Sequence, residues 1–354
     1  MYVDGHLDIA YNALASRRDF AAGVAAIRAA EQPPDPHVGT ATVGLPDLRR
    51  GSVGLVFATL FTLPAAADSP GLPADMSYAT PEEARAQALA QLDYYRGLAD
   101  RGLARLILSR DDLAAHRAAW PDDGRLGIVV LMENGDPIVR PSDVAWWVAR
   151  GVRIVGPAWQ GTRYCGGTRQ PGPLTPLGRA LLPELAAAGV ILDVSHMAEE
   201  SFWQSLELWP GTLIASHSNC RALVGEHVAD RHLSDAMIKA LVERDAVIGA
   251  VLYNAFLAAD YRRGDPKSAY GLEIVVRHID RICQIAGDAR HAAIGSDLDG
   301  GLGREHIPRE LDSVADMPRL AEALAAHGYA DADVAAIMGG NWLRVLERGL
   351  PAHG

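Results

Sequence analysis

The sequence predicts a (β/α)8 TIM barrel, in which eight parallel strands form a ring inside a layer of helices. Three observations support this fold class. Eight short runs are continuously apolar, as strands covered on both faces should be. Helix-like segments lie between many of these runs, and this alternation predicts a parallel sheet. Five runs close on a histidine or an acidic residue, at the strand end where this fold carries its functional side chains.

The expected strands, in chain order, are residues 1–8, 52–61, 126–133, 152–159, 189–196, 212–218, 246–253 and 291–298. The expected helices are residues 81–100, 142–151, 175–189, 233–245 and 273–287. Several of these helices have N-terminal start signals and several end at glycine. Loops are expected at 31–46, 62–80, 161–174 and 258–270, where proline, glycine and alanine accumulate or the periodic pattern lapses. With no repeat or linker, residues 1–354 are expected to form one domain.

Composition narrows the possible partners. The chain of 354 residues has a net charge of −11 and no run of Lys and Arg, which argues against nucleic acid and anionic membranes. It has no apolar stretch of about 18 residues and no signal-peptide pattern at its start, so a cytoplasmic location is expected. The cysteines, Cys165, Cys220 and Cys283, fit a reducing compartment and are expected to be buried thiols rather than ligands.

The polar residues that close the strands form a candidate metal site. They are His6, Asp8, Glu133, His196, His217 and Asp297. Each has an ordinary interpretation when taken alone, such as a His–Asp hydrogen bond or a carboxylate at a helix N-terminus. Together, imidazoles and carboxylates at one barrel mouth are the ligand set of zinc and similar ions.

The arrangement predicts two divalent ions, with zinc as the expected metal. His196, His217 and Glu133 would hold one ion, and His6, Asp8 and the same Glu133 would hold the other. Asp297 would accept and return a proton. A carboxylated lysine as the bridge is excluded, because neither lysine closes a strand.

The motifs DGHLDIA, MEN, ILDVSHM, IASHSNCRAL, RHLSD, GSDLDGG and GGNWLRVL resemble those of the membrane (renal-type) dipeptidase family, peptidase M19 of the amidohydrolase superfamily. The resemblance spans almost the whole chain. It implies a zinc-dependent dipeptidase that cleaves an amide bond with a metal-bridging hydroxide and often forms a homodimer. It assigns the ligand roles given above. It also implies that Arg231 binds the substrate carboxylate and that Tyr253 lies beside the substrate.

The sequence departs from the family pattern in two places, and the first of them keeps an alternative function open. Trp159 stands where the family usually has a histidine that stabilises the oxyanion, and losing such a donor costs about 3 kcal/mol. Arg163 or Tyr164 would then supply the donor, or the substrate would differ. The segment between His217 and Arg231 is also longer than usual, which makes Arg221 and His227 competitors for the carboxylate. The alternative function is hydrolysis of a cyclic amide, lactone or N-acyl amino acid on the same metal centre. A binding protein without catalysis is disfavoured by the complete ligand set.

Overall fold

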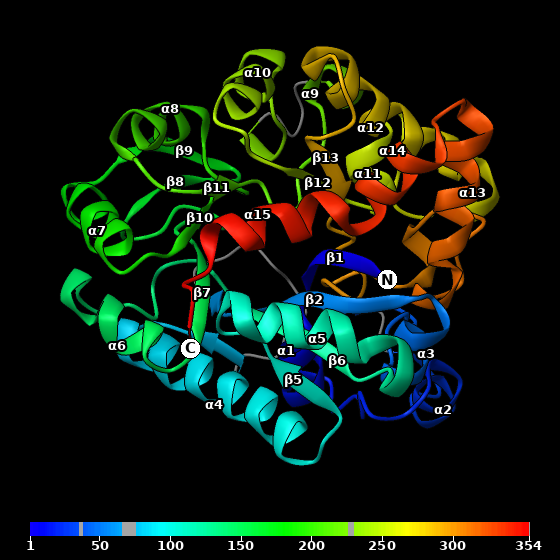
Figure 1. Cartoon of the computed structure of the whole chain (residues 1–354), viewed down its shortest axis with the longest axis horizontal. Helices are drawn as coiled ribbons and strands as arrows, with labels where there is room; N and C mark the ends of the chain where they lie inside the picture. The colour runs from blue at the N-terminus through cyan, green and yellow to red at the C-terminus, as the bar shows by residue number, and fades with distance from the viewer. Residues whose placement is uncertain (35–37, 66–75, 226–229, 354) are drawn as a thin grey trace.

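The computed structural model describes residues 1–34, 38–65, 76–225 and 230–353, and its centre is a curled parallel sheet (Figure 1). The sheet runs in the order β1 (Tyr2–Leu7), β2 (Val53–Phe61), β6 (Leu126–Glu133), β7 (Val152–Gly156), β10 (Ile191–Asp193) and β11 (Leu213–Ile214). A short strand absent from the sequence prediction, β5 (Ala104–Leu106), pairs with the start of β6. A separate parallel pair is formed by β12 (Ile248–Ala250) and β13 (Ala292–Ile294). All eight expected strands therefore exist, within an α/β fold.

Five of these strands end earlier than the sequence predicts. The chain leaves the sheet at Gly156, Asp193, Ile214, Ala250 and Ile294. In each case the polar or aromatic residue expected to close the strand lies three residues further on. Part of the reason is local. The Asp193 carboxylate accepts the backbone N–H groups of Ser195 and Ser216, which removes them from the strand ladder.

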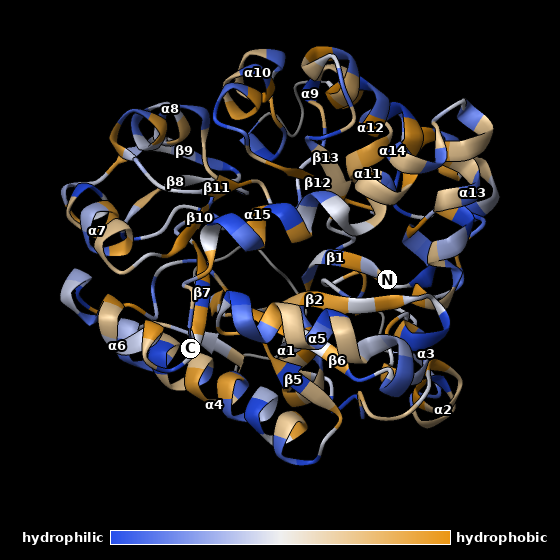
Figure 2. Cartoon of the chain, in the orientation of Figure 1, coloured by the Kyte–Doolittle hydropathy of each residue, from blue (hydrophilic) through white to orange (hydrophobic). Residues whose placement is uncertain are grey.

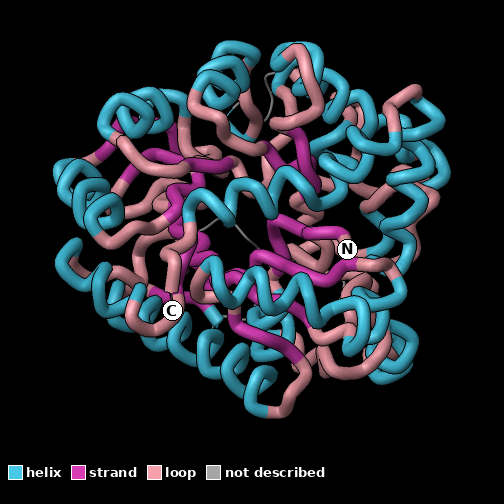
Figure 3. The backbone as a smooth tube through the Cα atoms, in the orientation of Figure 1, coloured by secondary structure: helices cyan, strands magenta, loops and turns pink. Residues whose placement is uncertain are grey.

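Helices surround the strands (Figures 1 and 3). Those expected from the sequence are α4 (Pro81–Asp100), α6 (Val144–Val148), α7 (Pro176–Ala187), α10 (Asp235–Glu243) and α12 (Leu272–Ala286). Further helices are α1 (Ile9–Ala15), α2 (Val24–Ala30), α3 (Leu45–Arg50), α5 (Arg110–Asp123), α8 (Glu199–Leu208), α9 (Arg221–Val224), α11 (Asn254–Leu257), α13 (Met317–His327), α14 (Asp331–Ala335) and α15 (Asn341–Gly349). Hydroxyl caps start several of them: Thr80 forms a capping box with Glu83, and Ser234 accepts from Met237.

Two expected loops contain short strands. Residues 161–174 fold into a hairpin of β8 (Cys165–Gly167) and β9 (Gln170–Leu174). Residues 62–80 contain the pair β3 (Leu63–Pro64) and β4 (Ser77–Tyr78), and 66–75 lie outside the described residues. The expected loop 258–270 contains only a 3-10 turn at Lys267–Ala269.

The strands consist largely of hydrophobic residues (Figure 2), and their side chains pack on both faces of the sheet. Along β2, Val56, Ala58 and Leu60 pack toward the surrounding helices, whereas Leu55 and Phe57 belong to a separate inner cluster. This alternation follows from the two-residue period of a strand. Trp342 of α15 joins the inner cluster and is fully buried, and its indole N–H donates to the backbone oxygen of Ile294 over 2.8 Å. The last helix therefore covers one end of the inner core.

The backbone carbonyl oxygen of Ser216 points at β12 and at the end of β13. A Cβ atom at Gly249 would lie 2.0 Å from this oxygen, and one at Gly295 would lie 1.9 Å from it. Real Cβ atoms do not approach so closely, so only glycine fits at both positions. These glycines let the segment that carries His217 pack closely against β12 and the end of β13.

Among the described residues, none of the helices combines the length and apolar character that a bilayer crossing requires. The three cysteines are buried and form no disulfide. Burial raises the pKa of Cys165 and of Cys220 to about 12. They therefore behave as small core residues, as the sequence predicts.

Candidate metal centre

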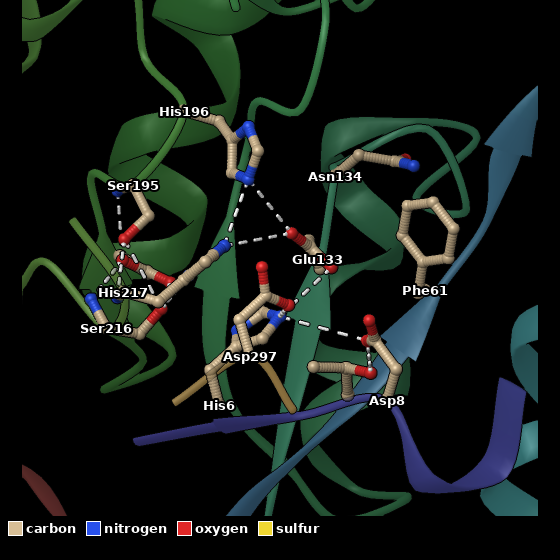
Figure 4. A network of polar contacts seen from close by, with 12 residues as sticks. His6, Asp8, Phe61, Glu133, Asn134, Ser195, His196, Ser216, His217 and Asp297 are labelled. Atoms are coloured by element: carbon tan, nitrogen blue, oxygen red, sulfur yellow. Dashed lines mark hydrogen bonds and ion pairs between the residues drawn. The ribbon is translucent and has the colours of Figure 1, made fainter. Parts of the chain in front are cut away.

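Two of the six predicted site residues lie within strands and four lie just beyond them, including Asp8 directly after β1. His6 is in β1, and Glu133 is the last residue of β6, two residues after the inner-cluster residue Leu131. His196, His217 and Asp297 follow β10, β11 and β13. His196 and Asp297 have left-handed backbone conformations, with φ of 65° and 58°. These turns direct their side chains back over the end of the sheet, where all the ligands meet (Figure 4).

Glu133 lies at the centre of the cluster, and its two oxygens face different partners (Figure 4). Oε2 is 3.3 Å from His6 Nε2. Oε1 is 3.3 Å from His196 Nε2 and 3.4 Å from His217 Nε2. The two Nε2 atoms of His196 and His217 are only 2.9 Å apart. One carboxylate therefore separates two groups of side chains.

The second group lies on the Oε2 side of Glu133. His6 Nε2 is 3.8 Å from Asp8 Oδ1 and 4.0 Å from Asp297 Oδ1. Thr59 donates its hydroxyl to Asp8 Oδ1. Ligand atoms of His6, Asp8 and Asp297 lie close enough together to hold one ion, as do those of His6, Glu133 and His217. His196 lies beside Glu133 and His217 and contacts both of them.

The histidine rings are oriented by contacts on their far sides. His196 Nδ1 is 2.9 Å from Thr168 Oγ1, and His217 Nδ1 is 2.8 Å from Ser216 Oγ. In both cases Nε2 is directed at Glu133. Such contacts, made by the ring nitrogen that does not face the metal, orient the ligands of metal sites.

The acidic groups have opposite electrostatic environments. Burial opposes ionisation of Glu133, but the three surrounding imidazoles hold its pKa well below its usual range. Burial, reinforced by the Asp8 and Glu133 carboxylates, raises the pKa of Asp297 well above its usual range. Burial and Glu133 also raise the pKa of Asp8 to about 6. Three carboxyl groups buried within one cluster need positive charge nearby to remain ionised together.

Divalent ions fit this donor set. Both ring nitrogens of His6 are buried and lack a hydrogen-bond partner among the described residues. The facing Nε2 atoms of His196 and His217 would repel each other as two lone pairs, and a cation between them removes that repulsion. A histidine and carboxylate set with a shared Glu is the chemistry of a two-metal hydrolytic site.

A cavity of about 210 Å³ opens above the cluster. All the predicted site residues line it except His6, which lies beneath: Asp8, Glu133, Trp159, His196, His217, Arg231, Tyr253 and Asp297. Arg231 is 2% exposed, and none of its guanidinium nitrogens has a hydrogen-bond partner in the described structure. Its guanidinium carbon lies 4.9 Å from the ring centre of Phe256, and burial lowers its pKa. A buried cation without a partner is suited to bind an anionic group.

Trp159 belongs to an aromatic wall of the cavity. Its ring centre lies 5.2 Å from that of Phe61 and 6.2 Å from that of His196, and Phe61 packs edge-on against Tyr11 at 5.0 Å. The expected position of Trp159 at the mouth is therefore observed. Sequence reasoning missed Tyr11 and Phe61, although Phe61 ends a predicted strand and could have been found by that signal.

The suggested substitute oxyanion donors do not reach the cavity. Arg163 donates to the carbonyl of Val139, and the Tyr164 hydroxyl donates to the carbonyl of Ile138. Arg221 pairs with Glu199 at 2.6 Å and so does not compete for the substrate. His227 lies outside the described residues. From the loop at 161–174, it is Arg169 and Thr168 that line the cavity.

Comparisons with known proteins show the family of this chain. The family model described as membrane dipeptidase (peptidase family M19) matches residues 1–349. A crystal structure of a metallo peptidase from Rhodobacter sphaeroides, liganded with a phosphinate mimic of the dipeptide L-Ala-D-Ala, is 26% identical, with a TM-score of 0.78 over 98% of this chain and 99% of that one. A solved dipeptidase of family M19 is 27% identical, with the same TM-score and 98% of each chain covered.

Curated sequences include further relatives of this chain. An uncharacterized protein encoded in the pqqA 5' region of Klebsiella pneumoniae is 36% identical over 256 residues, which cover 70% of this chain and 89% of that protein. A dipeptidase of Aspergillus oryzae is 30% identical over 175 residues, covering 49% of this chain and 39% of that one. The chain belongs to the membrane dipeptidase family, peptidase family M19, and is a metal-dependent hydrolase.

Proposed function

We propose that the protein is a binuclear zinc dipeptidase. The main support for the proposal is that the two oxygens of Glu133 face different histidines. Oε1 faces His196 and His217, whereas Oε2 faces His6. His196 and His217 would hold one ion, His6 and Asp8 would hold the other, and both would share Glu133. When bound, two such ions polarise a carbonyl and make water nucleophilic near neutral pH.

Asp297 is proposed as the group that moves the proton. Its oxygen lies within 4.0 Å of His6 at the edge of the cluster, and it lines the cavity. A carboxyl group whose pKa is raised by burial can accept a proton from water and return it to the leaving amine. The positive charge of Arg231 acts in the opposite direction and lowers the pKa of Asp297.

Arg231 is proposed to bind the C-terminal carboxylate of the dipeptide. The buried guanidinium lacks a partner, and a bidentate carboxylate would satisfy it. Tyr253 lines the same side of the cavity, with its ring centre 4.9 Å from that of Phe256. The substrate residue on the amino side of the scissile bond then faces the wall of Tyr11, Phe61 and Trp159.

We further propose that the curled sheet closes into a complete (β/α)8 barrel within a single domain, residues 1–354. A parallel bridge joins Ala215 to Ile248, linking β11 to β12. The N–H of Asp297 donates to the carbonyl of His6 over 3.3 Å, which links the end of β13 to β1. The inner cluster also takes Val247 and Ala293 from this second part of the sheet. A cytoplasmic homodimer is the assembly proposed from the family resemblance, and light scattering would test it.

A metal analysis combined with a dipeptide panel tests the function. We expect about two zinc ions per chain and hydrolysis of dipeptides with L or D residues at the C-terminal position. Glu133→Gln should lose metal from both sites and lose activity, because an amide bridges two cations poorly. Full metal content and activity in this variant would refute the bridging role. Hydrolysis of lactones or N-acyl amino acids without dipeptide cleavage would favour the alternative function.

A further inference from the structure

A chain of hydrogen bonds leads away from His217 into the core. His217 Nδ1 is 2.8 Å from Ser216 Oγ, and this hydroxyl lies 2.5 Å from Asp193 Oδ2. The other oxygen, Asp193 Oδ1, accepts the backbone N–H groups of Ser195 at 3.0 Å and Ser216 at 2.9 Å. All four residues are at most 3% exposed. Figure 4 shows Ser195 and Ser216 behind His217, on the side of its ring remote from Glu133.

The direction of each hydrogen bond in this chain follows from its donors. The Ser216 hydroxyl donates its single proton to Asp193 Oδ2. Ser216 Oγ must then act as an acceptor toward His217. Its second lone pair can accept from Ser195 Oγ, which lies 3.3 Å away. A neutral His217 therefore carries its proton on Nδ1 and directs the lone pair of Nε2 at Glu133.

We propose that Asp193 and Ser216 are positioning residues that set the tautomer of His217, so that Nε2 is available as a metal ligand. The inference rests on the proposed metal-binding role of His217. The proposal requires more of residue 193 than burial and shape, because its Oδ2 atom must accept the hydroxyl proton of Ser216. An amide of the same shape would reverse the chain.

Asp193→Asn makes this reversal explicit. The amide oxygen replaces Oδ1, where two backbone N–H groups require an acceptor. The NH2 group then replaces Oδ2 and donates to Ser216 Oγ. The hydroxyl proton of Ser216 is no longer held by Asp193 and can turn to His217 Nδ1, which favours the ring proton on Nε2. That proton faces Glu133 and blocks metal binding.

The chain contains a matched control on the other side of the site. Asp4 Oδ1 accepts the N–H groups of His6 at 3.2 Å and Ser296 at 2.8 Å, and Asp4 Oδ2 lies 2.5 Å from Ser296 Oγ. Ser296 also precedes a site residue, Asp297. Among the described residues, however, no imidazole is hydrogen-bonded to Ser296 Oγ. Asp4→Asn therefore makes the same chemical change in the same kind of buried contact without a tautomer to reverse.

The test combines nitrogen NMR with metal titration. Protein labelled with 15N-histidine and freed of metal is examined by long-range 1H–15N correlation, and His217 is assigned by its loss in His217→Gln. The wild type and Asp4→Asn should show a proton on Nδ1 of His217, and Asp193→Asn should show it on Nε2. Titration of the metal-free proteins with Co2+ should show binding at one site weakened about 10–100-fold in Asp193→Asn.

Two further variants, Ser216→Ala and Asp193→Asn/Ser216→Ala, distinguish a reversed tautomer from general disruption of the fold. Ser216→Ala should leave the tautomer unfixed, with both forms present. In Asp193→Asn/Ser216→Ala the reversing donor is gone, so the Nε2–H form should decline relative to Asp193→Asn alone. A proton that remains on Nδ1 in Asp193→Asn would overturn the proposal. A wild type with the stated tautomer that binds no Co2+ would instead refute the metal-binding function and leave the hydrogen-bond chain intact.

Discussion

Asp297 and Glu133 are neighbouring acids whose environments shift their pKa values in opposite directions. The imidazoles around Glu133 hold its pKa low, whereas burial beside other carboxylates raises that of Asp297. Pairs of titratable groups separated in this way identify which group remains charged and which exchanges a proton. Glu133 is thus suited to permanent ligation and Asp297 to proton transfer.

Replacing Asp297 tests this division of roles. Asp297→Asn keeps the shape of the side chain and removes the proton acceptor. We expect kcat for a dipeptide to fall about 10²–10⁴-fold, the usual contribution of general acid–base catalysis, with both ions retained. Elemental analysis beside steady-state kinetics measures both effects. Loss of one ion from the variant would show that Asp297 is a ligand.

Trp159 is expected to limit the cleavage of simple dipeptides. Its indole lies against Phe61 and beside His196, where it adds an apolar wall in place of a polar donor. Trp159→His should raise kcat/KM for L,L-dipeptides, by up to about 100-fold if one oxyanion donor is restored. Trp159→Phe enlarges the cavity without a donor and serves as the control. An equal gain in both variants, or high general dipeptidase activity of the wild type, would contradict the donor argument.

At the scale of elements, the sequence predicts which strands exist better than where they end. Apolar runs continue through Val194 and Val251, so they extend each predicted strand to His196 and Tyr253. The chain instead leaves the sheet early, because buried acids such as Asp193 take over the backbone donors. Such contacts join residues 23 positions apart and leave no periodic signal.

The predicted ligands nevertheless meet, because each strand still delivers its residue to the same end of the sheet. In the aromatic wall, Trp159 and Phe61 end predicted strands and carry the same signal, whereas Tyr11 in α1 carries none. Tyr11, Phe61 and Trp159 come from α1, β2 and the turn after β7. Nothing in their local sequence indicates that these three rings pack together.

His278 in α12 links three helical segments and carries a pH dependence of stability. Its Nδ1 accepts the N–H of Cys220, which caps α9, and its Nε2 donates to the carbonyl of Leu257 in α11. Burial lowers its pKa to about 4. The unfolded chain, with an ordinary His pKa of about 6.5, binds the proton first as the pH falls. Stability is therefore lost between pH 6.5 and 4.

His278→Gln tests this account, because glutamine can accept and donate in the same contacts but does not titrate. Between pH 7 and 5 the wild type should lose about 2 kcal/mol that the variant keeps. Urea unfolding at both pH values gives the difference. An identical pH dependence in the two proteins would show that the ring is not held neutral.

The whole molecule buries three carboxyl groups together at the end of the sheet, where burial and the charge of neighbouring carboxylates oppose their joint ionisation. Asp8, Glu133 and Asp297 are each at most 8% exposed, and Arg231 supplies one positive charge nearby. Bound ions would therefore stabilise the folded state by mass action, by about 4 kcal/mol at a thousand times Kd.

Removing the ions should lower the melting temperature. For a chain of this size we expect a decrease of roughly 5 °C after chelation, reversed by added Zn2+. Differential scanning calorimetry measures the shift. Glu133→Gln serves as the control, since its melting temperature should respond little to chelator. No shift in the wild type would argue against ions that bind only the folded state.

The two glycines packed on the Ser216 carbonyl restrict how this protein can change by mutation. Any other residue at 249 or 295 would collide with a backbone atom rather than with a side chain that can rotate away. In a saturation mutagenesis library selected for soluble protein, both positions should retain only glycine. The wall formed by Phe61 and Trp159 should accept many alternatives. Descendants of this sequence can therefore acquire new substrates through the cavity wall, whereas the segment that carries His217 is fixed by the backbone beneath it.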